Sequence, residues 1–427
     1  MTETENKQGG NVFAIATMFA LFFMIAFVTN FASPMGVIAK NQFHASNALS
    51  QLGNAANFIA YLFMGIPGGL ILKRTGYKFT ALAAVAVGFA GVGVQLISGY
   101  ISSFAVYVLG AFIAGFSMCM LNLVVNPMLN TLGGGGNKGN QLVQFGCSLN
   151  SVGATLSPAV LGWLIGEITK DTAFIKAAPA LMIAMGIFAL AFLIVAFSKI
   201  PEPHMETADE KAARLAGKTS VMRDIVATLK FRHFTFGALA IFFYIVIEVG
   251  VPSMGMLYMT EVGKEWYVGG AVAGVVCGAY WFLMMCGRLL GGVVGGKFSS
   301  RVQVSFLATL GICLLLAVMF TPVKMITLFG YKFPLSMAFM VAVGLCTSVM
   351  WGGIFNMAAE GLGKYVPMGS GIFMAMVFGG ILIPVQGFLA DKIGILNSYW
   401  LSIALLAYVL IYAFFLSKPS RNIAKVD

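Results

Sequence analysis

Residues 177–198 read AAPALMIAMGIFALAFLIVAFS, a run of twenty-two residues without one charged side chain. A helix that crosses the roughly 30 Å hydrocarbon core of a bilayer needs about 20 apolar residues. This run therefore predicts a transmembrane helix, and similar runs recur along the whole chain. The strands of membrane barrels alternate apolar and polar residues. These runs are continuous instead, so helices are favoured.

The composition is typical of a protein whose surface faces lipid. Of the 427 residues, 59% are hydrophobic and 10% are charged, and the mean hydropathy is +0.91. Soluble domains carry about 25% charged residues, so an ordinary soluble enzyme is excluded. The net charge of +11 comes from bases that lie between the apolar runs, which argues against a nucleic-acid partner. The six cysteines lie in apolar stretches without metal-ligand spacing, so we expect no metal and no other cofactor.

Twelve apolar runs predict an all-α membrane protein with twelve transmembrane helices. The longest polar stretch, residues 199–233, separates six runs from the other six. We therefore predict an N-terminal six-helix half (1–198), a cytoplasmic linker (199–233) and a C-terminal six-helix half (234–427). Charged and apolar residues interleave at helical spacing over 206–230, which indicates a surface helix. The predicted spans are 12–38, 47–72, 79–97, 104–131, 141–166, 177–198, 234–260, 268–296, 302–320, 334–359, 367–390 and 395–416.

The basic residues predict the orientation. With the N-terminus inside the cell, the inner loops and tails hold eighteen lysines and arginines and the outer loops hold seven. Basic residues concentrate on the cytoplasmic side of membrane proteins. We expect a multi-pass protein of a bacterial inner membrane with both termini and the linker in the cytoplasm.

The two halves repeat short patterns six spans apart. Residues 153–158 (GATLSP) correspond to 379–384 (GGILIP), and Pro34-Met-Gly36 corresponds to Pro252-Ser-Met-Gly255. Parallel repeats with a substrate site near the bilayer midplane are an arrangement of secondary transporters. The pattern favours a transporter with two pseudo-symmetric halves and a central site.

Glu248 is the one acidic residue near the middle of a span, and Tyr244 lies one helical turn before it. Ionisable groups inside the membrane are costly and usually functional. We expect Glu248 to bind a coupling cation, H⁺ or Na⁺, or a substrate hydroxyl, with an interhelical hydrogen bond or salt bridge as the alternative. Arg288 in span eight is the one buried base, and a snorkelling or helix-packing role is favoured over an anionic substrate. Arg288 could also pair with Glu248 in one conformation, but because the depths of the two residues differ by about 9 Å, a permanent pair is not expected.

Amides and aromatic rings lie on helix faces in both halves. Amides donate and accept hydrogen bonds, so a set of them suits a neutral polyhydroxylated ligand, although a single asparagine is more often a contact between helices. The candidates for substrate binding are Asn30, Asn57, Asn122, Asn126, Asn150, Trp351 and Asn356. Further candidates for substrate contact or gating are Tyr61, Tyr244, Gln144, Arg288 and Gln386.

Short motifs in spans two, four, five, seven, ten and eleven match one known set of patterns. Residues 61–67 (YLFMGIP) resemble Tyr-Phe-x-Met-x-Ile-Pro, and Asn126-Pro127 resembles Glu-x-x-x-Asn-Pro. Residues 150–154 (NSVGA) resemble Asn-Ser-x-Gly-Ala. The patterns are those of the L-fucose permease and glucose/galactose porter family of the major facilitator superfamily. Further similar positions are Glu248-Val249, Glu360–Tyr365, Gly369-Ser-Gly371, Gly379-Gly380, Pro384, Gly387 and Asp391.

The resemblance implies the major facilitator fold and sugar transport. The L-fucose/proton members of this family carry acids in spans one and four, where this chain has Asn30 and Asn122. Their glutamine in span five corresponds to Cys147 here, whereas the neighbouring asparagine is kept as Asn150. Two candidate proton carriers are therefore amides, which makes L-fucose and that proton route less expected and leaves Glu248 as the candidate for coupling.

These observations together predict a monomeric importer of a neutral hexose or related monosaccharide that works by alternating access in the bilayer. Coupling to H⁺ or Na⁺ is expected at Glu248, and uncoupled diffusion stays open. An importer of an anionic sugar acid that uses Arg288, or an exporter of small molecules, is the alternative on the same fold. A transport-inactive sugar sensor is disfavoured because the linker of about 35 residues is shorter than a typical domain.

Overall fold

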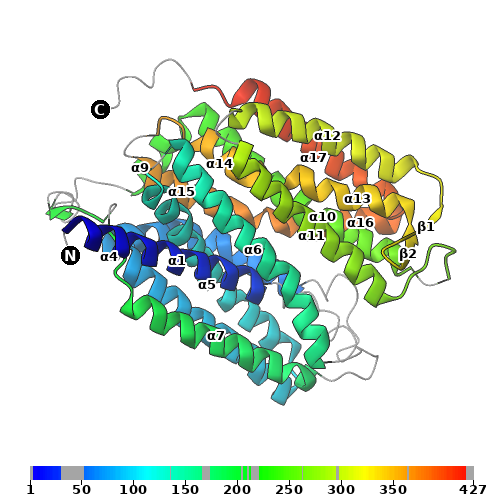
Figure 1. Cartoon of the computed structure of the whole chain (residues 1–427), viewed down its shortest axis with the longest axis horizontal. Helices are drawn as coiled ribbons and strands as arrows, with labels where there is room; N and C mark the ends of the chain where they lie inside the picture. Colours follow the sequence, from blue (N-terminus) through cyan, green and yellow to red (C-terminus); the bar gives the residue numbers. More distant parts are fainter. Residues whose placement is uncertain are drawn as a thin grey trace. The chain divides into compact units, whose positions relative to one another are not determined.

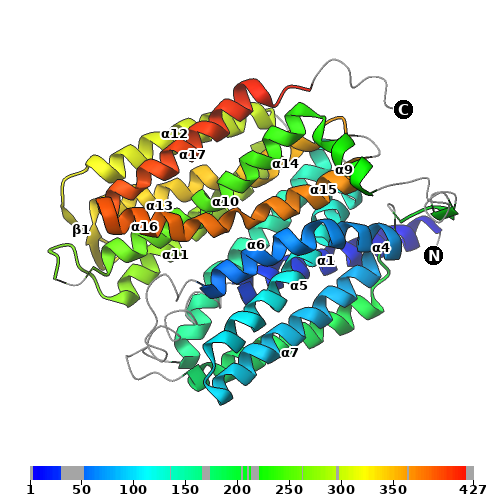
Figure 2. The same cartoon turned by 180° about the vertical axis from the view of Figure 1, so that it is seen from behind.

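The computed structural model describes residues 3–29, 52–134, 136–165, 174–202, 205–208, 211–212, 221–261, 263–294, 298–362 and 365–419. Within these ranges, ten helices are long and apolar enough to cross a membrane. One of them, α4 (Leu52–Ile101), has 50 residues and a break at Gly76, so it covers two of the expected spans. α6 (Gly136–Ile165) is the remaining helix. Its 30 residues are enough to cross a membrane, but its amides and serines lower its mean hydropathy, so it is not among the ten. The prediction of twelve membrane helices is confirmed, and Figures 1 and 2 show them from opposite sides.

The first of two compact units contains the N-terminal helices. Its elements are α1 (Glu3–Thr29), α4, α5 (Phe104–Leu132), α6, η1 (Phe174–Ala177), α7 (Ala178–Phe197), α9 (Val221–Leu229) and α15 (Val366–Ala375). α1 packs against α5 and α6, while α4 packs against α5, α7 and α15. A Cβ on Gly65 of α4 would lie 2.5 Å from the backbone nitrogen of Ala375. Glycine at this position therefore lets α4 and α15 approach closely.

The second unit contains most of the C-terminal helices. Its elements are α10 (Arg232–Met259), α11 (Gly270–Val294), α12 (Ser300–Phe320), β1 (Met325–Leu328), β2 (Tyr331–Pro334), α13 (Leu335–Thr347), α14 (Met350–Ala359), α16 (Ile383–Ile393), η4 (Leu396–Ser398), α17 (Tyr399–Ile411) and the π-helical η5 (Tyr412–Leu416). α13 packs against α11 and α12, and α12 also packs against α17. The 3₁₀ segment η3 (Met376–Leu382) begins in the first unit and ends in the second. The predicted boundaries of the two halves, 1–198 and 234–427, stay a prediction.

The start of the linker is fastened to the break in α4. Gly76 has a φ of 85°, a conformation that glycine adopts without strain, and the chain re-enters helix after it. The Glu202 carboxylate accepts hydrogen bonds from the backbone N–H groups of Tyr77 and Lys78. The Lys78 ammonium donates to the Ser198 carbonyl at 3.0 Å. An acidic group at a helix start satisfies free N–H groups and the helix dipole, so the linker caps the second segment of α4.

A small hairpin, β1 and β2, was not expected from the sequence. The two strands pair antiparallel, with Leu328 opposite Tyr331. Phe329 and Gly330 in the turn both have positive φ, at 49° and 82°. Two positive φ values in a two-residue loop define the turn that matches the twist of a hairpin. The segment lies in the stretch between the ninth and tenth predicted spans, where only a loop was anticipated.

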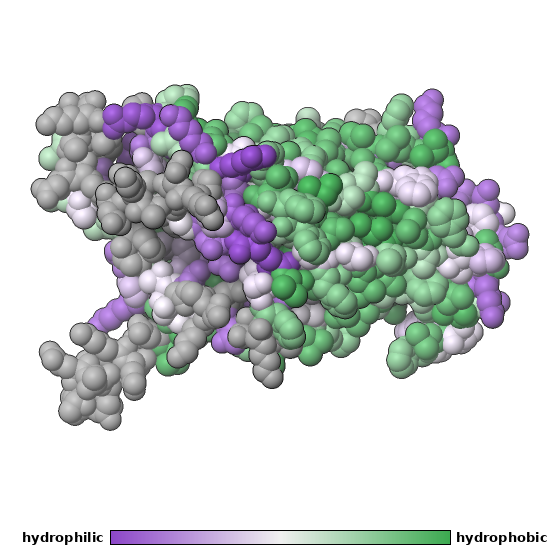
Figure 3. Space-filling view, turned by 90° about the horizontal axis from the view of Figure 1, so that it is seen from above, coloured by the Kyte–Doolittle hydropathy of each residue, from purple (hydrophilic) through white to green (hydrophobic). Residues whose placement is uncertain are grey.

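Apolar side chains on the surface agree with a multi-pass membrane protein. Figure 3 shows them across the middle of the visible face, with hydrophilic side chains toward both ends. Phe306 on α12 is 66% exposed and Phe415 in η5 is 74% exposed. Exposed patches of this kind on a soluble monomer are rarely larger than a few hundred Å², whereas lipid solvates them.

Candidate functional site

Glu248 lies in α10 at a point where the helix cannot complete its own hydrogen bonding. Pro252 follows Glu248 by four residues and has no N–H to donate to the Glu248 carbonyl. The hydroxyl of Tyr280 on α11 donates to this carbonyl at 3.1 Å. In a membrane such a carbonyl must find a partner within the protein. Tyr280 therefore stabilises the proline-containing helix beside Glu248, the acid near the middle of this span.

A second irregular helix faces the same group of side chains. The helix formed by α13 and α14 is interrupted at Ser348 and Val349. The Tyr244 hydroxyl donates to the Thr347 carbonyl at 3.2 Å, and Arg288 Nε donates to the Ser348 carbonyl at 3.3 Å. The Thr347 hydroxyl lies 3.1 Å from the Tyr280 hydroxyl. Interrupted membrane helices with carbonyls that bind side chains or ions occur at transport sites.

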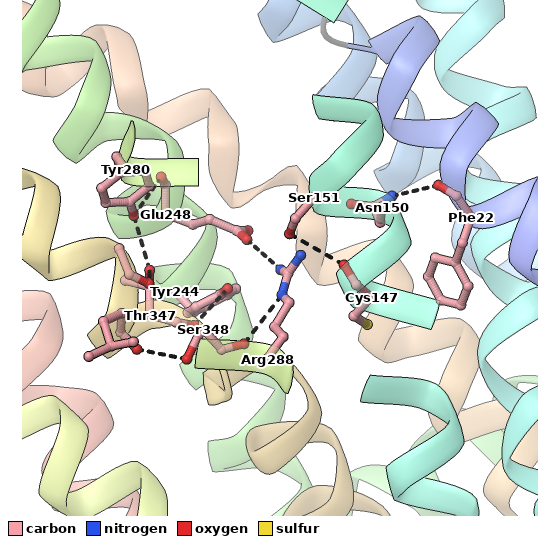
Figure 4. A network of polar contacts seen from close by, with 12 residues as sticks. Phe22, Cys147, Asn150, Ser151, Tyr244, Glu248, Tyr280, Arg288, Thr347 and Ser348 are labelled. Atoms are coloured by element: carbon pink, nitrogen blue, oxygen red, sulfur yellow. Dashed lines mark hydrogen bonds and ion pairs between the residues drawn. The ribbon is translucent and has the colours of Figure 1, made fainter. Parts of the chain in front are cut away.

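The central contact is an ion pair between Glu248 and Arg288. Arg288 Nη2 lies 3.1 Å from Glu248 Oε1, and the two side chains are 8% and 13% exposed (Figure 4). The sequence left open a pair in one conformation and did not favour a permanent one, and this structure shows the two side chains paired. The long arginine side chain extends along apolar surface and brings its charge to a group at another depth. One partner compensates the charge of the other in a region where a lone charge would be costly.

Trp351 is attached to this network at the start of α14. It follows Ser348 by three residues, and its ring centroid lies 6.3 Å from that of Tyr244. Tyr244 itself is fully buried and hydrogen-bonded at the helix interruption. The geometry therefore connects Glu248, through Arg288 and the Ser348 carbonyl, to an aromatic ring that could pack on a sugar.

A separate polar cluster lies in the first unit, where α4 meets α5. Asn122 Nδ2 donates to the Tyr61 hydroxyl oxygen at 3.0 Å and to the Met118 carbonyl at 3.0 Å. Asn126 Nδ2 donates to the Asn122 carbonyl at 2.9 Å. Asn122 and Asn126 thus share one face of α5, as their helical spacing predicted, and Tyr61 of α4 contacts Asn122. The amide oxygen of Asn122 lies at 3.4 Å from Asn126 Nδ2, so the two amides share one face.

Other predicted residues of the first unit lie on α4 and α6. Asn150 Nδ2 donates to the Phe22 carbonyl at 3.0 Å, which ties α6 to α1 (Figure 4). Gln144 is buried on the same helix, one turn before the buried Ser148. Asn57 is 6% exposed, and its Oδ1 has no hydrogen-bond partner among the described residues. Asn30 lies outside the described residues.

Residues 16–331 match the sequence profile of the Major Facilitator Superfamily. The chain belongs to this superfamily. A "Glucose/galactose transporter" of Brucella abortus is 27% identical over 98% of this chain and 97% of its own length. A "Putative glucose/galactose transporter" of Helicobacter pylori is 28% identical over 97% and 100%. The "L-fucose-proton symporter" of Escherichia coli is 24% identical over 96% and 94%.

A solved structure of this superfamily has the same fold. The crystal structure of the major facilitator transporter FucP in the outward conformation superposes with a TM-score of 0.73 at 19% identity, and covers 96% of this chain and 100% of that chain. The chain is therefore a major facilitator transporter and not an enzyme. The resemblance to the fucose and glucose/galactose branch, stated from the motifs, agrees with the relatives.

Two predicted site residues of this transporter form hydrogen bonds outside the Glu248 network. Asn356, at the far end of α14, is exposed, and its Nδ2 donates to Ser300 Oγ at the start of α12 at 3.1 Å. Gln386 is fully buried in α16, where its Nε2 donates to Ser402 Oγ of α17 at 3.1 Å. These contacts join helices, and a role of either residue in transport stays a prediction.

Sequence reasoning missed three residues that build the network around Glu248. Tyr280, Thr347 and Ser348 were not among the candidates, because a tyrosine, a threonine and a serine in apolar spans are common. One signal was available: Pro252, four residues after Glu248, leaves a carbonyl that needs a donor. Which helix supplies the donor depends on tertiary packing, which the spacing along one helix does not reveal.

Proposed function

We propose that this transporter imports a neutral hexose, glucose or galactose, across a bacterial inner membrane together with a cation. The relatives named glucose/galactose transporters align over nearly the whole chain, which supports the substrate class. The E. coli relative named a proton symporter supports coupled transport. Import by alternating access as a monomer is part of the proposal.

The amides of the first unit suit the substrate. Asn122 and Asn126 offer donors and acceptors on one face beside the Tyr61 hydroxyl. The Asn57 amide oxygen, buried without a partner among the described residues, is a further acceptor that a hydroxyl could satisfy. Sugar hydroxyls both donate and accept, and an unmet buried polar group favours a ligand that meets it. We assign Asn57, Asn122 and Asn126, with Asn150 and Trp351, to substrate binding.

The ion pair carries the proposal for coupling. A proton or Na⁺ that binds Glu248 competes with Arg288 for the carboxylate, because one charge cannot satisfy both. Arg288 also holds the Ser348 carbonyl at the helix interruption, three residues before Trp351. Cation binding at Glu248 would therefore loosen the contact that positions α14. In this proposal, cation binding at Glu248 changes the position of the Trp351 ring, which contacts the sugar.

The same pair makes the alternative substrates less suitable. An importer of sugar acids needs a cation whose charge is available to the substrate. The Arg288 charge is compensated by Glu248 at 3.1 Å. A neutral sugar is therefore favoured over an anionic one, and no observation favours export.

Counterflow uptake in proteoliposomes tests the proposal. A sugar panel, with and without Na⁺ and at two pH values, identifies the substrate and the cation. In Glu248→Gln, we expect sugar exchange to persist while accumulation driven by a pH or Na⁺ gradient is lost, because the neutral amide takes up no proton and has no negative charge to hold Na⁺. The matched control is Glu261→Gln, which removes an acid from the exposed Lys264 pair and should leave both activities unchanged. Gradient-driven accumulation that survives in Glu248→Gln contradicts the coupling role.

The orientation also belongs to the proposal. The excess of bases in the predicted inner loops supports cytoplasmic termini. Fusions of alkaline phosphatase and green fluorescent protein to the C-terminus test it. Fluorescence without phosphatase activity is expected, and the opposite result would reverse the topology.

A further inference from the structure

The short helix α9 turns its apolar side outward and its polar side toward the protein. Residues spaced by three and four share one face of a helix, and the apolar residues of α9 form one continuous arc. On the opposite arc, Thr228 is fully buried and Asp224 is half-buried. The exposed apolar residues of α9 are Val221, Met222, Val226 and Leu229.

This arrangement is the reverse of that of a helix in water. A helix on a soluble surface buries its apolar face and exposes its polar face. Here Met222 is 66% exposed and Val226 is 48% exposed. An apolar medium or partner must therefore cover this side of α9.

The position of α9 along the chain indicates which medium this is. Residues 198–231 connect two membrane-spanning helices, α7 and α10, and only Lys230 and Phe231 lie between the end of α9 and Arg232, where α10 starts. Two hydrogen bonds hold the turn between α9 and α10. Phe231 N donates to the Thr228 carbonyl at 3.1 Å, and Thr235 Oγ1 donates to the Leu229 carbonyl at 2.7 Å. α9 is therefore held next to the start of a helix that is long and apolar enough to cross a membrane.

The polar side of α9 is fixed by the protein. α9 packs against α15, beside which it lies in Figures 1 and 2. In the turn between α9 and α10, the centroid of the Phe231 ring lies 6.0 Å from that of the Tyr365 ring, which is next to the start of α15. These contacts set the rotation of α9 and leave its apolar arc pointing away from α15.

We propose that α9 is an interfacial helix whose apolar face inserts into the lipid surface at the cytoplasmic side. Interfacial helices have an apolar face bordered by basic residues and lie in the plane of the membrane. Arg223 and Lys230 are exposed and border the apolar arc on one edge. Their charges suit anionic headgroups, which are the chemistry that this surface would meet.

Site-directed spin labelling tests the proposal in vesicles of phosphatidylethanolamine and phosphatidylglycerol. Nitroxides are placed at Met222→Cys and Val226→Cys, and at the matched control Arg223→Cys, in a background without the six native cysteines. Collision with oxygen, which partitions into lipid, should exceed collision with a water-soluble nickel complex at 222 and 226. The depth should be about 5–10 Å below the headgroup level. The control should show the opposite preference.

A second measurement keeps the native cysteines. The emission of the tryptophan added in Met222→Trp, taken as the difference from the parent with its five tryptophans, should fall in vesicles of brominated lipid and resist aqueous iodide. Quenching by iodide alone would place the face in water and overturn the proposal. Protection from both quenchers would show that a protein partner or a second copy covers the face, and would also overturn it.

Discussion

The Glu248–Arg288 pair makes a quantitative prediction about stability. Replacing Arg288 by methionine leaves the Glu248 carboxylate at 13% exposure without its partner and removes the donor to the Ser348 carbonyl. Removing one partner of a buried ion pair typically destabilises by about 3–5 kcal/mol, because the remaining charge is uncompensated. We expect a loss of this size in the free energy of unfolding of Arg288→Met at neutral pH.

A double-mutant cycle separates the pair from other contacts. In the double variant with Glu248→Gln no charge is stranded, so we expect a loss of only about 1–3 kcal/mol for the unmet Ser348 carbonyl. The coupling energy between the two positions should then be at least about 2 kcal/mol, because Glu248→Gln alone strands the Arg288 charge and is itself destabilising. Equilibrium unfolding of purified protein in mixed micelles of dodecyl sulfate and dodecyl maltoside, followed by tryptophan fluorescence, measures all four variants.

The exposed pair Lys264–Glu261 provides the control. Its side chains are 46% and 39% exposed, and exposed ion pairs contribute about 0–1 kcal/mol. Lys264→Met should therefore change stability little. A coupling energy below about 0.5 kcal/mol between positions 248 and 288 would mean that the two sites act independently, and the reasoning about the pair would be refuted.

Three further changes test the packing and the site. Gly379→Ala should abolish folded protein in size-exclusion chromatography, because its Cβ would collide with the Phe242 carbonyl oxygen, whereas Gly186→Ala, with open space around the new Cβ, should behave as the parent. Tyr280→Phe removes the donor to a helix carbonyl and should cost about 1–3 kcal/mol in the same unfolding assay; an unchanged midpoint would contradict that role. Asn122→Ala should raise the KM for sugar counterflow about tenfold or more, as loss of a hydrogen bond worth about 1.5 kcal/mol predicts; an unchanged KM would remove this amide from the binding set.

The number and placement of the spans could be predicted because they follow from local composition. About 20 consecutive uncharged apolar residues match the thickness of the bilayer core, so a stretch such as 177–198 predicts a membrane helix and not a helix on the surface of a soluble protein. The structure places α7 at Ala178–Phe197, within a residue of that prediction at each end. The hairpin of β1 and β2 was missed because its turn, Phe329-Gly330, lacks the asparagine or aspartate that usually marks such turns.

The candidate site was predictable in part. Glu248 and the faces of Asn122 and Asn126 followed from burial cost and helical spacing. The pairing of Glu248 with Arg288 did not, because counting residues gives the depth of a backbone atom and not the reach of a long side chain. The hydrogen bonds from Tyr244 and Tyr280 to carbonyls also depend on which helices are neighbours, which no spacing along one helix reveals.

Pro252 and the Tyr280 hydroxyl compensate each other. The first deletes a donor from α10, and the second restores it from α11. A chain with alanine at 252 would regain its own donor and make the hydroxyl dispensable, whereas a chain with phenylalanine at 280 would tolerate proline poorly. Efforts to straighten or stabilise this helix by design should therefore exchange both positions at once.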